Sequence, residues 1–192
     1  MDFKLILQIA GVVLGLLYLY LEYKANIWLW LVGLAMPAIH SVLYFRSGLY
    51  ADFGMQIYYV LAGVYGFVAW RLARGEQKVN KDVEGICRIP VRTAGTLLFI
   101  LVILNAALYL FLSRMTDSTV PFWDSFTTSL SVIAMWMLSR KYVEQWLVWM
   151  LVDAVTVGLY FYKGIPITAG LYLLYTALAA VGYRKWLKGM KA

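Results

Sequence analysis

Residues 30–70, WLVGLAMPAIHSVLYFRSGLYADFGMQIYYVLAGVYGFVAW, are matched without a gap by residues 146–186, WLVWMLVDAVTVGLYFYKGIPITAGLYLLYTALAAVGYRKW. The offset is a constant 116 residues, and twelve of the 41 aligned positions are identical. The identities include a tryptophan at each end and three matched glycines between them. Internal repeats in a membrane protein that crosses the bilayer many times are typical of transporters. We therefore expect two related halves, with a substrate site near their interface.

The composition places the chain among membrane proteins. Of its 192 residues, 63% are hydrophobic and the mean hydropathy is +0.74, whereas soluble domains are about 45–50% apolar. The net charge of +7 is explained by basic residues that orient the helices, so we expect no nucleic-acid partner. The single cysteine, Cys87, excludes an intramolecular disulfide and a cysteine-based metal cluster. Phosphate-loop, serine-hydrolase and zinc-protease motifs are missing from the sequence, so we expect neither enzymatic activity nor a cofactor.

Seven apolar segments are long enough to cross a bilayer, which takes about 20 residues. The first has no clear cleavage site, so we expect it to be retained rather than removed as a signal peptide. The fold class is therefore an all-α membrane protein, a single membrane domain over residues 1–192. The predicted spans are 3–21, 27–45, 52–72, 95–113, 119–138, 143–162 and 166–184.

The distribution of lysine and arginine predicts the orientation. Seven spans divide the basic residues into thirteen on one side and four on the other. The positive-inside rule places the richer side in the cytoplasm, so the N-terminus is expected outside and the C-terminus inside. The thirteen are Lys24, Arg71, Arg74, Lys78, Lys81, Arg88, Arg92, Arg140, Lys141, Arg184, Lys185, Lys188 and Lys191, and the four are Lys4, Arg46, Arg114 and Lys163.

The span count gives the repeat a geometry. Three spans per copy would invert the second copy, but the fourth span restores the direction. We expect a 3+1+3 arrangement of parallel repeats, related by an axis along the membrane normal. The parts are a first three-helix repeat over 1–72, a basic loop and linking helix over 73–118, and a second repeat over 119–192.

Trp146, Trp149 and Asp153 share one face of the sixth span. Two aromatic rings and a carboxylate on one stripe could hold a flat cationic ring by stacking, cation–π attraction and opposite charge. The alternative is that the tryptophans belong to the core and to the interfacial belt, with Asp153 as a structural acid hydrogen-bonded to a neighbouring helix. Intramembrane ionisable residues are costly and tend to line substrate pathways, which makes Asp153 a candidate for either role.

Other polar and aromatic residues inside the spans complete the candidate set. His40, the only histidine, has no partner at metal-ligand spacing, so we expect it to line a cavity or pack, and we expect no metal site. Asn105 in the fourth span is expected to join helices by a hydrogen bond. The candidate substrate-binding residues are Trp30, His40, Gln56, Tyr59, Trp136, Trp146, Trp149, Asp153 and Tyr175.

Several stretches resemble the PnuC family of vitamin transporters. In the first half they are Leu49-Tyr50-Ala51-Asp52, Gln56-Ile57-Tyr58-Tyr59 and Tyr65-Gly66 with Trp70. In the second they are Trp123-Asp124, Glu144-Gln145-Trp146-Leu147-Val148-Trp149 with Asp153, and Tyr160-Phe161-Tyr162-Lys163-Gly164. The resemblance covers essentially the whole chain.

The resemblance implies a fold similar to the SWEET sugar carriers and a homotrimer in the bacterial inner membrane. It implies facilitative uptake of an unphosphorylated vitamin by alternating access, with trapping by a cytoplasmic vitamin kinase. Many family members have a glutamine in the fifth span where this chain has Met135, and methionine cannot read a carboxamide. Met135 therefore weakens the case for nicotinamide riboside and strengthens that for thiamine. Nicotinamide riboside remains the first candidate and thiamine the alternative, since both carry a cationic aromatic ring.

Two further questions stay open at the level of sequence. A function of another class is a substrate-binding subunit of a multi-component importer, which the basic loop 71–93 would suit as a docking site. Gly48, Gly164, Pro37 and Pro166 are candidate hinges, and for the two glycines a simple turn is the preferred interpretation.

Overall fold

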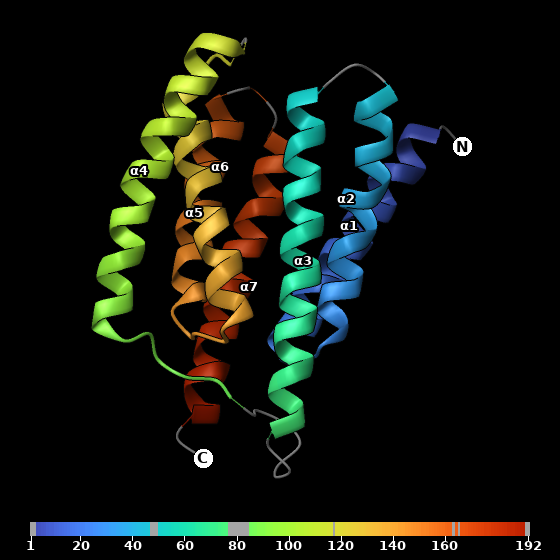
Figure 1. The fold of residues 1–192 in the computed structure, drawn as a ribbon. Helices are drawn as coiled ribbons and strands as arrows, with labels where there is room; N and C mark the ends of the chain where they lie inside the picture. The colour runs from blue at the N-terminus through green and yellow to red at the C-terminus, as the bar shows by residue number, and fades with distance from the viewer. Residues whose placement is uncertain are drawn as a thin grey trace. The chain divides into compact units, whose positions relative to one another are not determined.

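The computed structural model describes residues 3–46, 50–76, 85–116, 118–162, 164 and 166–190. In this part of the chain there are seven α-helices, as the seven apolar segments predict. They fall into two compact units, Met1–Gly85 and Ile86–Ala192 (Figure 1).

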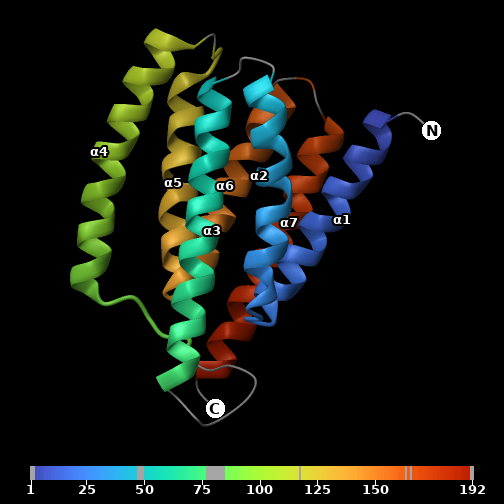
Figure 2. The same ribbon diagram turned by 45° about the vertical axis from the view of Figure 1, so that its right-hand side comes forward.

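The first unit contains α1 (Phe3–Tyr23), α2 (Trp28–Arg46) and α3 (Tyr50–Glu76). The middle helix, α2, packs on both neighbours, and the two ribbon views agree on this order (Figures 1 and 2). The side chain of Asn26 starts α2, because its Oδ1 accepts a hydrogen bond of 3.0 Å from the backbone N–H of Trp28. Such a side chain satisfies one of the donors that a helix leaves open at its N-terminus.

The second unit contains α4 (Val91–Met115), α5 (Pro121–Ser139), α6 (Gln145–Tyr162) and α7 (Pro166–Met190). Its helices pack in chain order, α4 on α5, α5 on α6 and α6 on α7 (Figure 2). Proline stands at the first position of both α5 and α7, where its missing N–H costs the helix nothing. The linking helix α4 is thus part of the second unit.

The helices exceed the predicted spans mainly at three ends, one of which is the start of α4, at Val91 rather than 95. The third predicted span ends at 72 and the seventh at 184, whereas α3 continues to Glu76 and α7 to Met190. The extensions contain arginine, lysine and alanine, which are good helix formers. Hydropathy marks where a segment leaves apolar surroundings, so it underestimates a helix that continues into the polar boundary.

Trp30 anchors the first unit between α2 and α3. Its side chain is 1% exposed and meets Trp70 edge to face, with ring centroids 5.7 Å apart at 88°. Gly66, one turn before Trp70, lies directly against the Trp30 ring, so that an added Cβ would overlap it. Glycine at this position lets the two helices approach as closely as they do.

Trp146 anchors the second unit between α6 and α7 in the same way. It is 1% exposed, and its ring meets that of Trp186 edge to face at 5.6 Å and 90°. An added Cβ at Gly182 would lie 2.7 Å from the Trp146 ring. The residues that pack here are the repeat partners, at an offset of 116, of those in the first unit. Three of the twelve identities, two tryptophans and one glycine, are therefore explained by the same helix–helix contact in each unit. The parallel 3+1+3 relation of the two copies stays a prediction.

A backbone bracket joins the segment before α4 to the turn between α5 and α6. Cys87 donates its N–H to Lys141 O (3.2 Å), and its carbonyl accepts from Val143 N–H (3.0 Å), which forms an isolated parallel bridge between Cys87 and Tyr142. The carboxylate of Glu144 accepts the N–H of Ile89 at 3.0 Å. The start of α4 is thereby fixed to the end of α5.

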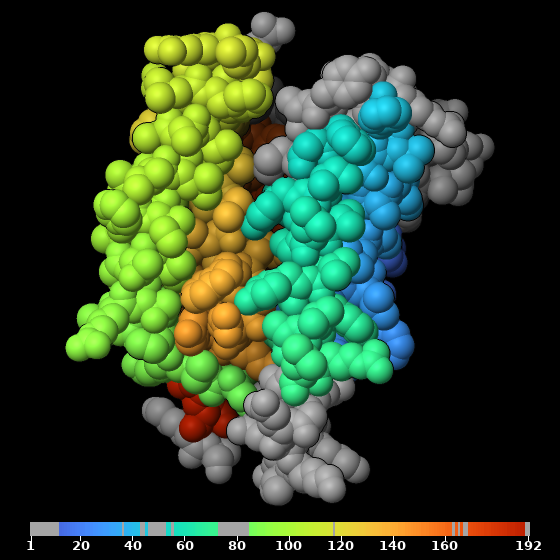
Figure 3. Space-filling model, in the orientation of Figure 1, coloured from blue at the N-terminus to red at the C-terminus, as the bar shows by residue number. Residues whose placement is uncertain are grey.

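The linking helix α4 is exposed along its length. None of its 25 residues is buried, and Leu98, Phe99 and Val102 are more than 60% exposed. Figure 3 shows the side chains of this helix on the surface. Its most apolar 18 residues have a mean hydropathy of 2.4, and α6 reaches 1.2. By length and composition these are the two helices, among the described residues, that could cross a membrane. An apolar helix with no buried residue is suited to contact with lipid.

The hinge candidates occupy different kinds of position. Gly164 has a φ of +70° in the connection between α6 and α7, and its N–H reaches Phe161 O at 3.1 Å. It is a turn residue, as preferred from the sequence. Pro37 lies inside α2 and Pro166 begins α7, while Gly48 lies outside the described residues.

Candidate functional site

Asp153 is an acidic residue buried near the middle of α6. Its side chain is 8% exposed, and its carboxyl oxygens are not among the enclosed polar atoms that lack a partner in the described part of the chain. The structural-acid alternative required a hydrogen bond to a tyrosine or tryptophan of a neighbouring helix, and none is present among these residues. A carboxylate that is largely removed from water is costly, and a bound cation would relieve that cost.

Tyr175 of α7 is the polar neighbour of Asp153. The two side chains interact electrostatically, across the α6–α7 contact. The Tyr175 ring meets Tyr172 at 5.7 Å and 69°, and Tyr172 stacks on Tyr160 of α6 at 5.4 Å and 23°. A row of phenol rings therefore adjoins the carboxylate.

Trp149 precedes Asp153 by one helical turn and shares its face of α6. Its indole is half-buried, and the indole N–H has no acceptor among the described residues. The same holds for the enclosed indole N–H groups of Trp30, Trp146 and Trp186, so it is the half-buried ring of Trp149 that is suited to a planar ligand. We call Trp149, Asp153, Tyr172 and Tyr175 the Asp153 cluster.

Trp146 packs between helices in this structure and is not part of the Asp153 cluster. Trp146 is fully enclosed by Trp186 and Gly182, and Trp30 by Trp70 and Gly66. Both are packing residues here, so contact between either indole and a substrate stays a prediction.

The remaining candidates of the first unit lie on two helices. His40 is half-buried on α2, and Gln56 and Tyr59 are half-buried on α3, where Tyr59 meets Tyr58 at 5.4 Å. At the repeat position of Trp149 the first unit has Gly33. Tyr18 of α1 covers that glycine, because an added Cβ would lie 2.9 Å from Tyr18 Cε2.

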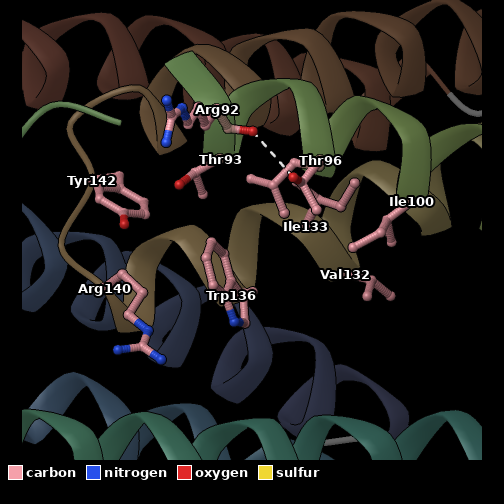
Figure 4. A pocket seen from close by; sticks show the side chains of 10 residues that line it. Arg92, Thr93, Thr96, Ile100, Val132, Ile133, Trp136, Arg140 and Tyr142 are labelled. Carbon is pink, nitrogen blue, oxygen red and sulfur yellow. Dashed lines mark hydrogen bonds between the residues drawn. The ribbon is translucent and has the colours of Figure 1, made fainter. Parts of the chain in front are cut away.

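Trp136 lies away from the Asp153 cluster, at the end of α5. Its ring lies beneath the guanidinium of Arg140, with Cζ 5.6 Å from the ring centroid, and 5.9 Å from the ring of Tyr142. It lines a pocket between α4 and α5 (Figure 4). A substrate role for Trp136 stays a prediction.

Asn105 and Tyr172 lie outside the set of candidate substrate-binding residues, and the structure gives each of them a contact. Asn105 does join helices, because its Oδ1 accepts a hydrogen bond of 3.4 Å from Ser125 Oγ on α5. Tyr172 was not among the candidates, although it precedes Tyr175 by three residues and therefore shares its helix face. That spacing, and its mismatch with Gln56 across the repeat, could have indicated it.

Comparison with known proteins gives one family over almost the whole chain. The family model described as nicotinamide mononucleotide transporter matches residues 5–188. The nicotinamide riboside transporter PnuC of Escherichia coli (strain K12) is 23% identical over 206 residues, which cover 96% of this chain and 86% of that protein. The riboflavin/roseoflavin transporter RibM of Streptomyces davaonensis is 27% identical over 184 residues, 93% and 83% of the two chains.

A solved structure has the same fold. The crystal structure of the vitamin B3 transporter PnuC superimposes with a TM-score of 0.71 at 24% identity, and the match covers 94% of this chain and 80% of that one. A PnuC protein of Neisseria mucosa is 25% identical over 192 residues, 95% of this chain and 72% of the relative.

Proposed function

The chain belongs to the nicotinamide mononucleotide transporter family, and from that membership we propose that it takes up an unphosphorylated vitamin with a cationic aromatic ring. The family consists of membrane transporters rather than enzymes. Nicotinamide riboside is the first candidate substrate and thiamine the alternative.

The observation that carries the choice of a cation is Asp153. A carboxylate 8% exposed, without a hydrogen bond among the described residues, sits beside Trp149 and Tyr175. An aromatic face attracts a cation by about 2 kcal/mol when both are desolvated, and a nearby negative charge adds to this. Pyridinium and thiazolium rings carry the charge within the ring, so stacking and charge pairing can act on one group.

Riboflavin is a second candidate, favoured by the relative RibM at 27% identity. Its ring system is aromatic but uncharged. The Asp153 cluster offers it stacking, but an uncharged ring gives no reason for a buried carboxylate. Replacing the Asp153 carboxylate with a neutral group should therefore weaken binding of a cationic vitamin but not binding of riboflavin.

The transport cycle that we propose is facilitative. The substrate moves down its gradient by alternating access, and a cytoplasmic kinase traps it by phosphorylation. The protein acts as a homotrimer in the bacterial inner membrane with its C-terminus in the cytoplasm. The segregation of thirteen basic residues from four supports this orientation.

The test is a binding titration of the purified protein with nicotinamide riboside, thiamine and riboflavin, followed by uptake into liposomes that contain only this chain. Saturable binding and uptake of one of the two cationic vitamins is the expected result. Uptake by the chain alone would exclude the alternative of a subunit that needs an energising partner. Failure to bind any of the three by a correctly folded protein would contradict the proposal.

Replacing Trp149 with alanine is expected to weaken binding of the cationic vitamin roughly tenfold or more, at about 1.4 kcal/mol per decade. The reason is loss of the ring face next to Asp153. Trp149→Phe keeps a ring and loses the indole N–H, so it separates stacking from hydrogen bonding. Trp28→Ala is the control, since Trp28 is 59% exposed at the start of α2. Unchanged affinity in Trp149→Ala would assign this residue to packing.

A further inference from the structure

A pocket lies between α4 and α5, within the second unit. Its volume is about 620 Å³, inside the range of about 300–1,000 Å³ that is common for ligand sites. All of its lining comes from α4, α5 and the turn after α5. The Asp153 cluster contributes none of its lining residues, so this pocket is separate from the proposed vitamin site.

The two ends of the pocket differ in chemistry. Arg92, Arg140, Tyr142 and Thr93 lie at one end of the pocket, the guanidinium groups of the two arginines on opposite sides of it (Figure 4). The other end is aliphatic, with Ile100 and Val132. No acidic side chain is among the lining residues of this pocket. Two cations without a balancing acid disfavour a cationic vitamin and favour an anion.

The position of the arginines corresponds to a membrane boundary. Arg92 lies in the first turn of α4 and Arg140 caps the C-terminus of α5. The Cys87–Tyr142 bridge holds these two helix ends together. From there α4 runs on as an exposed helix with a mean hydropathy of 2.4. A ligand in the pocket would thus have its charged part at the boundary and its apolar part along α4.

We propose that this pocket binds an anionic phospholipid, with the phosphate at the arginine end and an acyl chain along the aliphatic wall. Arginine is well suited to phosphate, because its planar fork can donate two parallel hydrogen bonds. Basic pockets between membrane helices are known to receive anionic headgroups. Trp136 and Tyr142 add amphipathic rings, which prefer the headgroup level. This site requires only that the chain lie in a membrane, and it is independent of which vitamin is carried.

The experiment uses the purified full chain in a neutral detergent. Phosphatidylglycerol, phosphatidylcholine and inorganic phosphate are added in separate arms, and retained lipid is measured by native mass spectrometry together with the thermal unfolding midpoint. We expect phosphatidylglycerol to be retained and to raise the midpoint, and the other two to have little effect. In the Arg92→Gln/Arg140→Gln double variant, binding of phosphatidylglycerol should weaken roughly thirtyfold.

Matched variants make the result specific. Arg114→Gln removes a charge from the last turn of the same helix and should bind like the unaltered protein. Arg92→Lys/Arg140→Lys keeps both charges but loses the fork, so its binding should lie between that of the unaltered protein and that of the double glutamine variant. An equal effect of phosphatidylcholine, an equal loss in Arg114→Gln, or no retention of phosphatidylglycerol would overturn the proposal. A midpoint shift by inorganic phosphate as large as that by the lipid would also overturn it, because the site would then be a plain anion site.

Discussion

Gly66→Ala and Gly182→Ala are each expected to lower the free energy of unfolding by about 1–3 kcal/mol, the usual cost of overpacking a core. The new methyl group at Gly182 would lie 2.7 Å from the Trp146 ring, and the one at Gly66 would overlap Trp30. Both indoles are 1% exposed and are rigid, so neither can give way without a shift of a helix. Thermal unfolding of the detergent-solubilised protein measures the effect.

Gly54→Ala and Gly170→Ala are the matched controls. These two glycines are also repeat partners in helices, but a Cβ at either would meet nothing within 4 Å. Alanine is better than glycine in a helix by about 1 kcal/mol, so the controls should be neutral or stabilising. If all four variants unfolded at the same temperature, close helix packing at Gly66 and Gly182 would not be a source of stability.

Asp153→Asn is expected to weaken binding of a cationic vitamin roughly thirtyfold or more, since breaking a buried charge pair costs at least about 2 kcal/mol. The amide keeps the size of the side chain and removes its charge. Riboflavin, if it binds, should be almost unaffected, because its ring carries no charge to pair. Isothermal titration with each vitamin measures the difference.

Two control variants test whether the loss of affinity in Asp153→Asn comes from the lost charge rather than from a folding defect. Asp153→Glu keeps the charge and should bind more tightly than Asp153→Asn. Asp124→Asn makes the same chemical change at the start of α5, where the carboxylate is held by Ser118 at 2.6 Å, and should leave vitamin affinity unchanged. An Asp153→Asn protein that binds the cationic vitamin normally would return Asp153 to a structural role.

The helices were predictable because each is an apolar run bounded by polar or turn residues. Asn26 and Pro166 stand at starts, and Gly164 stands in a turn. The ends of α3 and α7 were missed, since arginine and lysine keep a helix going where hydropathy falls. The matched glycines were visible as a repeat, but sequence could not show which of them touch an indole. Gly66 and Gly182 do, whereas Gly54 and Gly170 do not.

The candidate site was predicted only in part, because periodicity assigns a face to a residue but not a partner. The spacing puts Trp149 and Asp153 on one face of α6, and their binding of a substrate stays a prediction. It also placed Trp146 on that face, yet the ring of Trp186 on α7 meets it there. Trp136 looked equivalent to the other tryptophans, and only the structure places it beside Arg140. Contacts between helices of this kind are not contained in the sequence pattern of one helix.

The hydrogen bond between Ile89 and Glu144 spans 55 residues of chain, and this has a consequence for biosynthesis. At about 5–20 residues per second, the ribosome needs roughly 3–11 s after Ile89 before Glu144 exists to receive its N–H. Almost half of that interval is the synthesis of α4 itself. Between Met115, where α4 ends, and Glu144 the helix lacks its bracket, and for most of that time a complete α5 as well. The most apolar 18 residues of α4 have a mean hydropathy of 2.4, enough for a helix to enter a bilayer without such contacts, so its insertion does not have to depend on the helices that follow it.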